Sequence, residues 1–175
     1  MNYKFNRAWA EVNLDNIAHN VREIKKIVDK KTEIMGVVKA DAYGHGVMGV
    51  AKTLINNGVT RLAVSMLDEA IQLRNYGIDV PILILSYTDP IRAEEIVENG
   101  VTQTVFSLEL AKALSEAAVK LNKRVKIHIK IDTGMGRVGF MPGYSAVKNV
   151  VEISKLPGII VEGLFTHFAS ADEQD

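Results

Sequence analysis

The feature that most constrains this 175-residue chain is a repeated alternation of short apolar segments with amphipathic stretches. The apolar segments, which we expect to be strands, cover residues 33–39, 61–65, 80–85, 101–106, 124–131 and 159–165. Between them apolar residues recur with a helical period, as at Val47, Val50, Ala51, Leu54 and Ile55. This alternation is typical of parallel βα units, so we expect an α/β fold.

Periodicity alone leaves open whether the parallel strands form a doubly wound sheet or a barrel. A full (β/α)8 TIM barrel usually needs about 250 residues, so a barrel here would be incomplete, with about six of its eight βα units. No linker or low-complexity tract divides residues 1–175, which we therefore expect to belong to one domain. Asp15, Asp89 and Ser107 are placed to cap helices.

Composition excludes several classes of function. Lysine plus arginine equals aspartate plus glutamate at 21 each, so no charge imbalance points to nucleic acid or to a membrane surface. The chain has no cysteine, its four histidines are scattered, and we expect no metal site. Neither a bilayer-length apolar run nor a signal peptide is visible. We expect a cytoplasmic protein.

The stretch from Val37 to Gly46 reads Val-Val-Lys-Ala-Asp-Ala-Tyr-Gly-His-Gly and passes from a strand into a glycine-spaced loop. Lys39 lies at this changeover, where parallel α/β folds collect their ligands. Apolar walls there favour the neutral amine that Schiff-base chemistry needs, although many strand-end lysines are merely solvated. We expect the helix start near residue 47 to offer free amides to an anion, and His45 to be structural.

A second candidate lies on the strand His128-Ile129-Lys130-Ile131-Asp132, which alternates polar and apolar residues. If the isoleucines face the outer helices, Lys130 points into the barrel. A buried ammonium is costly unless it is paired, and Asp132 is the nearest partner in the sequence.

Two further strand ends carry candidate binding residues. The loop Asp132-Thr-Gly-Met-Gly-Arg-Val-Gly139 places Arg137 where it could bind a carboxylate bidentately, although a solvated arginine is the simpler interpretation. The segment Phe165-Thr-His-Phe-Ala-Ser-Ala-Asp172 places His167 just beyond the sixth strand.

Residues 37–46, 132–137 and 165–172 occur in the order and context of three motifs of the alanine racemases, and essentially the whole chain resembles the first half of that family. The resemblance implies a barrel that binds pyridoxal 5'-phosphate, with Lys39 as the catalytic lysine that holds the cofactor covalently. It places Tyr43 near the cofactor phosphate, Arg137 against cofactor and substrate, and His167 against the pyridoxal ring. It also implies that Lys130 is carbamylated by carbon dioxide and holds a neighbouring arginine.

The same resemblance implies a cytoplasmic homodimeric isomerase that interconverts L- and D-alanine and supplies D-alanine for peptidoglycan. In the family a C-terminal β domain follows the barrel, and the partner subunit supplies the second base, a tyrosine. None of the five tyrosines here matches that residue, so we expect this chain alone to be inactive or nearly so. Two alternatives stay open, namely a broad-specificity amino-acid racemase and a non-catalytic cofactor-binding or structural barrel fragment.

Overall fold

The computed structural model describes residues 8–173 and contains one six-stranded parallel sheet. Its strands are β1 (Met35–Val37), β2 (Arg61–Val64), β3 (Ile82–Ile84), β4 (Thr102–Val105), β5 (Val125–Lys130) and β6 (Ile159–Phe165). They are shorter than or equal to the predicted segments. The strands lie side by side in chain order, each parallel to the next. A doubly wound sheet reverses its strand order at a switch point, so this uninterrupted order identifies the barrel alternative.

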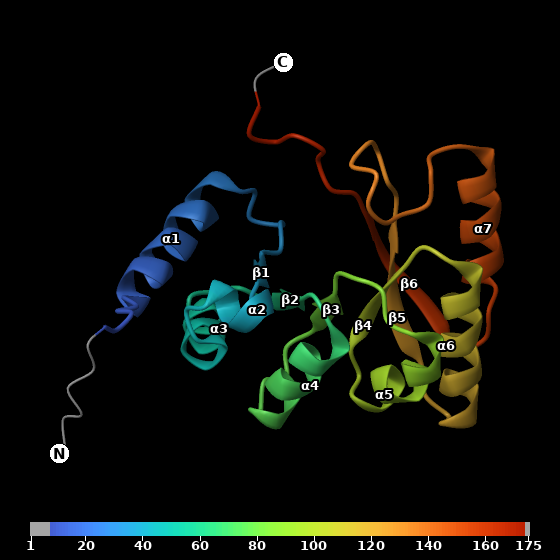
Figure 1. The fold of residues 1–175 in the computed structure, drawn as a ribbon, viewed down its shortest axis with the longest axis horizontal. Coiled ribbons are helices and arrows are strands. Elements are labelled where there is room, and N and C mark those ends of the chain that lie inside the picture. The colour runs from blue at the N-terminus through green and yellow to red at the C-terminus, as the bar shows by residue number, and fades with distance from the viewer. Residues whose placement is uncertain (1–7, 174–175) are drawn as a thin grey trace.

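Helices connect successive strands, as the periodicity predicts (Figure 1). They are α2 (Lys39–Tyr43), α3 (Val47–Asn56), α4 (Leu67–Asn75), the 3-10 helix η1 (Pro90–Arg92), α5 (Ala93–Glu98), α6 (Leu108–Lys120) and α7 (Tyr144–Ser154), while α1 (Leu14–Ile27) precedes β1. Helix α1 packs on α3, and α6 lies beside α7. Within residues 8–173, no helix has the length and apolar character needed to cross a membrane.

Two of the three predicted helix caps are confirmed. The Asp89 side chain accepts from the Ile91 amide, and the Ser107 hydroxyl accepts from the Leu110 amide at 3.3 Å. The prediction for Asp15 is wrong, because Asn13 caps α1 and accepts the Asp15 amide at 2.9 Å. The cap and the start of the helix lie two residues earlier than expected, which places Asp15 in the first turn, where a carboxylate still complements the helix dipole.

The outer face of the sheet is buried against the helices. Ile127 and Ile129 of β5 are fully buried in the hydrophobic core, together with Ile82 and Ile84 of β3. Side chains alternate across a strand, so Lys130 belongs to the opposite, inner face of β5. This confirms the predicted division of the strand into an apolar outer face and a polar inner face.

The sheet is strongly curved, with the polar inner face on its concave side. Arg61 of β2 and Glu162 of β6 form an ion pair of 2.8 Å, although their strands are four positions apart in the sheet. In a flat sheet those strands would be about 19 Å apart, at roughly 4.8 Å per strand. Such a short contact requires the sheet to bend around its interior, as a barrel wall does.

Candidate functional site

Lys39 lies two residues beyond the carboxyl end of β1 and is half-buried. The segment that it opens, α2, is not the loop that the sequence predicts but a turn of left-handed helix. Ala40, Asp41 and Ala42 have φ of 51–53° and ψ of 46–53°, and Tyr43 has φ of 57°. This conformation costs L-residues about 1–2 kcal/mol each. Strained backbone of this kind is concentrated at functional sites.

Hydrogen bonds within the segment hold the left-handed turn. The Ala42 amide donates to the Val38 carbonyl at 3.0 Å, and the Gly44 amide donates to the Ala40 carbonyl at 3.0 Å. Gly44 continues the positive φ at 80°, a conformation that glycine adopts at no steric cost. The His45 ring lies 2.9 Å from the Ala42 carbonyl through Nδ1, in keeping with the structural role expected for this histidine.

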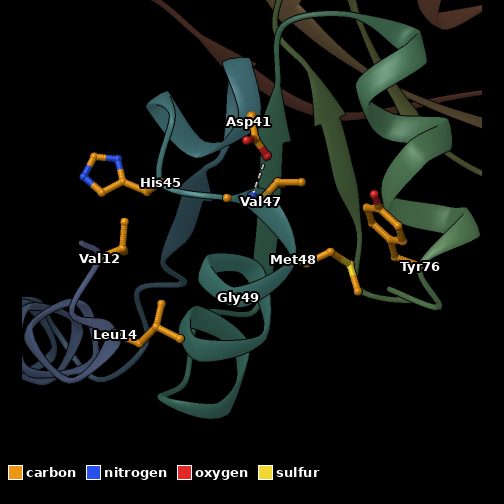
Figure 2. Close-up of a pocket in the computed structure, with 9 residues that line it drawn as sticks. Val12, Leu14, Asp41, His45, Val47, Met48, Gly49 and Tyr76 are labelled. Atoms are coloured by element: carbon orange, nitrogen blue, oxygen red, sulfur yellow. Dashed lines mark hydrogen bonds between the residues drawn. The ribbon is translucent and has the colours of Figure 1, made fainter. Parts of the chain in front are cut away.

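The predicted free amides at the start of α3 are not all free. The Asp41 carboxylate accepts the Val47 amide at 2.7 Å (Figure 2). A carboxylate therefore already occupies one of the positions that an incoming anion would use, and the sequence prediction of a free helix terminus is wrong for this amide.

The turn brings Tyr43 back beside Lys39. The Lys39 Nζ lies 5.9 Å from the centre of the Tyr43 ring, which itself is 60% exposed. These two predicted site residues therefore share one edge of the sheet, and the Tyr43 side chain is accessible to a ligand there.

Lys130 lies at the carboxyl end of β5 and is buried, with 3% of its surface exposed. Its Nζ is 5.8 Å from the centre of the Phe165 ring on β6. Among residues 8–173 no salt bridge to Lys130 is formed, so the predicted pairing with Asp132 is wrong. Burial lowers the pKa of Lys130, and the positive charge of Arg137 lowers it further.

Asp132 instead organises the loop that carries Arg137. Its carboxylate accepts the backbone amides of Gly134, Gly136 and Arg137 at 2.9–3.0 Å. These amide hydrogen bonds lower the pKa of Asp132 and satisfy its charge, which explains why it does not pair with Lys130. The Arg137 side chain is left exposed.

His167 lies two residues beyond β6 and is exposed. Its Nδ1 is 2.8 Å from the Phe168 carbonyl, and the adjacent Thr166 hydroxyl contacts the Thr133 hydroxyl at 2.7 Å. This second contact joins the end of β6 to the loop of Arg137.

The predicted residues thus lie at or just beyond the carboxyl ends of three strands, β1, β5 and β6. Lys39 lies beside Tyr43, the positive charge of Arg137 acts on the pKa of Lys130, and the contact between Thr133 and Thr166 joins the loop of Arg137 to the segment that carries His167. Sequence reasoning missed Glu69, whose carboxylate binds the Ala40 amide. Glu69 stands in the first turn of the helix predicted to begin near Leu67, and no local pattern signals its contact with a residue 29 positions away.

A pocket of about 350 Å³ lies beside the left-handed turn (Figure 2). Val12 and Leu14 line it, with Asp41 and His45 from the turn and Tyr76 from the end of α4. None of Lys39, Tyr43, Lys130, Arg137 and His167 lines this pocket.

No group of three or more histidine, aspartate or glutamate side chains suited to a metal occurs within the described part of the chain. The chemistry that the site offers is therefore that of a primary amine, a phenol, a guanidinium and an imidazole at one edge of a parallel sheet.

Comparison with known proteins gives close matches. Residues 12–175 match the family model described as the N-terminal domain of alanine racemase. The alanine racemase of Clostridium tetani is 53% identical over 167 residues, which is 95% of this chain and 43% of that protein.

Solved structures agree. The alanine racemase of Clostridium difficile 630 in complex with cycloserine has a TM-score of 0.93 at 46% identity, covering 97% of this chain and 46% of that one. A histidine racemase from Leuconostoc mesenteroides has a TM-score of 0.88 at 35% identity, covering 98% of this chain and 46% of that one.

The chain spans less than half the length of these relatives. The match nevertheless runs through all six strands and through the segments that carry Lys39, Lys130, Arg137 and His167. Because residues 12–175 match the family model and the fold is shared with solved alanine racemases at 46% identity, this chain belongs to the alanine racemase family.

Proposed function

We propose that this chain is the cofactor-binding barrel portion of a pyridoxal-phosphate-dependent racemase whose substrate is alanine. The observation that carries the proposal is the position of Lys39, a half-buried residue just beyond β1 that opens a strained turn and whose amine lies over the Tyr43 ring. The alanine racemases of the two Clostridium species support the proposal, because they are 46–53% identical to this chain over the aligned residues.

The residues present fit this cofactor. Lys39 supplies the primary amine that attaches to its aldehyde, and Tyr43 offers a phenol hydroxyl to its phosphate. Arg137 offers a cation to the cofactor or to the substrate carboxylate, and His167 would pack against the pyridine ring. When bound, pyridoxal phosphate supplies an electron sink that stabilises negative charge at the substrate Cα.

The part of Lys39 in the reaction is to move a proton. With the cofactor in place, the Lys39 amine would take the Cα proton from one face of the substrate. One base returns the proton to the face from which it came, so inversion requires a second base on the opposite face. In this proposal that base comes from a partner subunit of a homodimer, and the isolated chain has little or no activity.

We also propose that Lys130 is carbamylated. The ammonium would first lose one proton; the neutral amine would then attack carbon dioxide, forming an N–C bond while one C=O π bond breaks and a second proton leaves, so that a carbamate anion would stand in place of the cation. The burial of Lys130, its lowered pKa and its lack of an acidic partner among the described residues all favour this reaction. Incubation with isotopically labelled bicarbonate should give a carbamate carbon signal in NMR spectra that Lys130→Met abolishes; identical spectra would refute the modification.

The test of cofactor binding compares wild type with Lys39→Ala after addition of pyridoxal phosphate. We expect an absorbance band near the visible edge that survives dialysis in the wild type and is absent from the variant. Borohydride should fix the cofactor to the peptide that contains Lys39. A band of equal strength in Lys39→Ala would overturn the assignment, and oligomerisation without any band would favour a structural fragment.

The histidine racemase neighbour supports a second candidate, a racemase of other or broader amino-acid specificity. Racemisation of a panel of L-amino acids by the intact protein that contains this chain distinguishes the two. We expect alanine to give the highest kcat/KM. A higher value for histidine or another amino acid would replace the substrate but leave the cofactor chemistry in place.

A further inference from the structure

One carboxylate joins the segment after Lys39 to the neighbouring βα unit. Glu69 Oε1 accepts the Ala40 amide at 2.6 Å, while its Oε2 accepts the amides of Ser65 and Met66 at 2.7 and 3.0 Å. Ser65 and Met66 follow β2, and Glu69 lies in the first turn of α4. The contacts through Oε2 are those of an ordinary helix start. The contact through Oε1 is not part of a helix start, because it joins α4 to the backbone just beyond the end of β1.

The hydrogen bond between Glu69 and the Ala40 amide acts at the start of the left-handed turn. Ala40 is the first residue of the left-handed turn, and its amide belongs to the peptide group that joins it to Lys39. The other side-chain contacts of the turn, from Asp41 to Val47 and from His45 to Ala42, lie within residues 41–47. They stabilise the shape of the segment but do not attach it to the sheet. The Glu69 contact fixes the peptide group directly after Lys39 relative to β2.

We propose that Glu69 is a positioning residue for Lys39. By holding the Ala40 amide, it fixes the start of the strained turn, and with it the direction of the Lys39 side chain and its place beside Tyr43. This inference rests on the proposed function of Lys39 as the cofactor lysine. Glu69 itself acts through the backbone and does not need to touch cofactor or substrate.

The test uses Glu69→Gln in the intact protein that contains this chain. An amide group has one acceptor oxygen, so it cannot replace two carboxylate oxygens facing three donors. The matched control is Asp68→Asn, which removes the same charge one residue away, where Asp68 is exposed and pairs with Arg92. Glu69→Asp, whose shorter side chain keeps the charge, tests whether reach is needed.

Three measurements separate positioning from mere helix capping. Hydrogen exchange should become about tenfold faster or more at Ala40 and through residues 40–46 in Glu69→Gln, but not in Asp68→Asn. Attachment of pyridoxal phosphate to Lys39 should slow by a similar factor. In the racemisation assay, kcat of Glu69→Gln should fall by a larger factor than its KM changes. Equal behaviour of Glu69→Gln and Asp68→Asn in the first two measurements would overturn the proposal.

Two further readouts keep the outcome unambiguous. If Glu69→Gln does not fold, exchange in the wild type decides, because an Ala40 amide that exchanges as fast as in an unstructured peptide contradicts the proposal. If the wild type binds no pyridoxal phosphate, the proposed function fails by itself. The rate of acylation of Lys39 by acetic anhydride then still reports positioning, since unequal rates in Glu69→Gln and Asp68→Asn support it and equal rates refute it.

Discussion

At the scale of single residues, Lys130 is the side chain whose surroundings least suit its ordinary charge state. It has 3% of its surface exposed, and it has an aromatic ring rather than a carboxylate beside it. Burial of an ammonium group without a partner destabilises the folded state. The same environment that destabilises the charged form makes the neutral amine reactive, so stability and chemistry are opposed at this position.

We therefore predict that Lys130→Met stabilises the folded protein by about 1 kcal/mol in buffer free of carbon dioxide. The pKa of Lys130 is lowered from its ordinary 10.5, so the unfolded chain binds the proton more tightly than the folded one. The penalty is complete below the folded pKa and vanishes as the pH rises through 10.5. Urea unfolding at several pH values measures the difference.

The control for this prediction is Lys52→Met, which changes an exposed lysine of α3. It should leave the stability of the protein unchanged across the same pH range. A loss of stability in Lys130→Met at neutral pH would contradict the argument. Added bicarbonate should stabilise the wild type and not Lys130→Met if the carbamate forms.

At the scale of elements, the left-handed turn of α2 is the segment whose backbone opposes its own side chains. Four consecutive residues without glycine adopt positive φ, beginning at the exposed Ala40. A β-carbon in this conformation approaches the following carbonyl oxygen. The turn therefore persists through its hydrogen bonds to Glu69, Asp41 and Val38.

Removal of the β-carbon at Ala40 should relieve part of this strain. Ala40→Gly is expected to stabilise the fold by about 0.5–1 kcal/mol, after the greater freedom of glycine in the unfolded chain is subtracted. The comparison is an exposed position in the right-handed helix α6, where Glu116→Gly should be about 1 kcal/mol less stable than Glu116→Ala. Denaturant unfolding of all four proteins decides; a loss of stability of about 1 kcal/mol in Ala40→Gly would mean that the turn is unstrained.

At the scale of the whole molecule, the ion pairs of Glu162 join strands from the two halves of the sheet. Glu162 accepts from Arg61 on β2 and from Lys126 and His128 on β5. Burial alone would raise the pKa of Glu162, but the hydrogen bonds from these three side chains outweigh it and lower the pKa to about 2. The carboxylate is therefore a charged contact across the concave interior.

Glu162→Gln should destabilise the protein by about 1–3 kcal/mol, because it leaves the partly buried cations without their anion. The folded pKa is below the ordinary 4.5, so the contribution is complete above pH 4.5 and is lost as the pH falls toward about 2. Urea unfolding followed by circular dichroism should give free energies of unfolding for wild type and Glu162→Gln that become equal as the pH falls.

Glu33→Gln is the matched control, because Glu33 also binds Arg61, at 2.7 Å, but its side chain is 57% exposed and does not cross the interior. We expect a smaller loss from it. Equal losses in Glu33→Gln and Glu162→Gln would show that the contact across the sheet contributes nothing of its own.

The sequence by itself determined the repeated βα units, the helix caps at Asp89 and Ser107, and the placement of Lys39, Lys130, Arg137 and His167 at strand ends. These features depend on local periodicity and on residues a few positions apart, which is why a linear pattern contains them. The order of the six parallel strands followed from the same units only once the barrel alternative was chosen.

Only the tertiary structure decided the curvature of the sheet, the isolation of Lys130 and the hold of Glu69 on the turn after Lys39. The Glu69 contact joins residues 29 positions apart, and the contact between Arg61 and Glu162 joins residues 101 positions apart. Asp132 could have paired with Lys130 by its position in the sequence, but backbone amides of its own loop satisfied it first. Packing determines which of several possible partners a side chain binds, and a local sequence pattern does not contain that information.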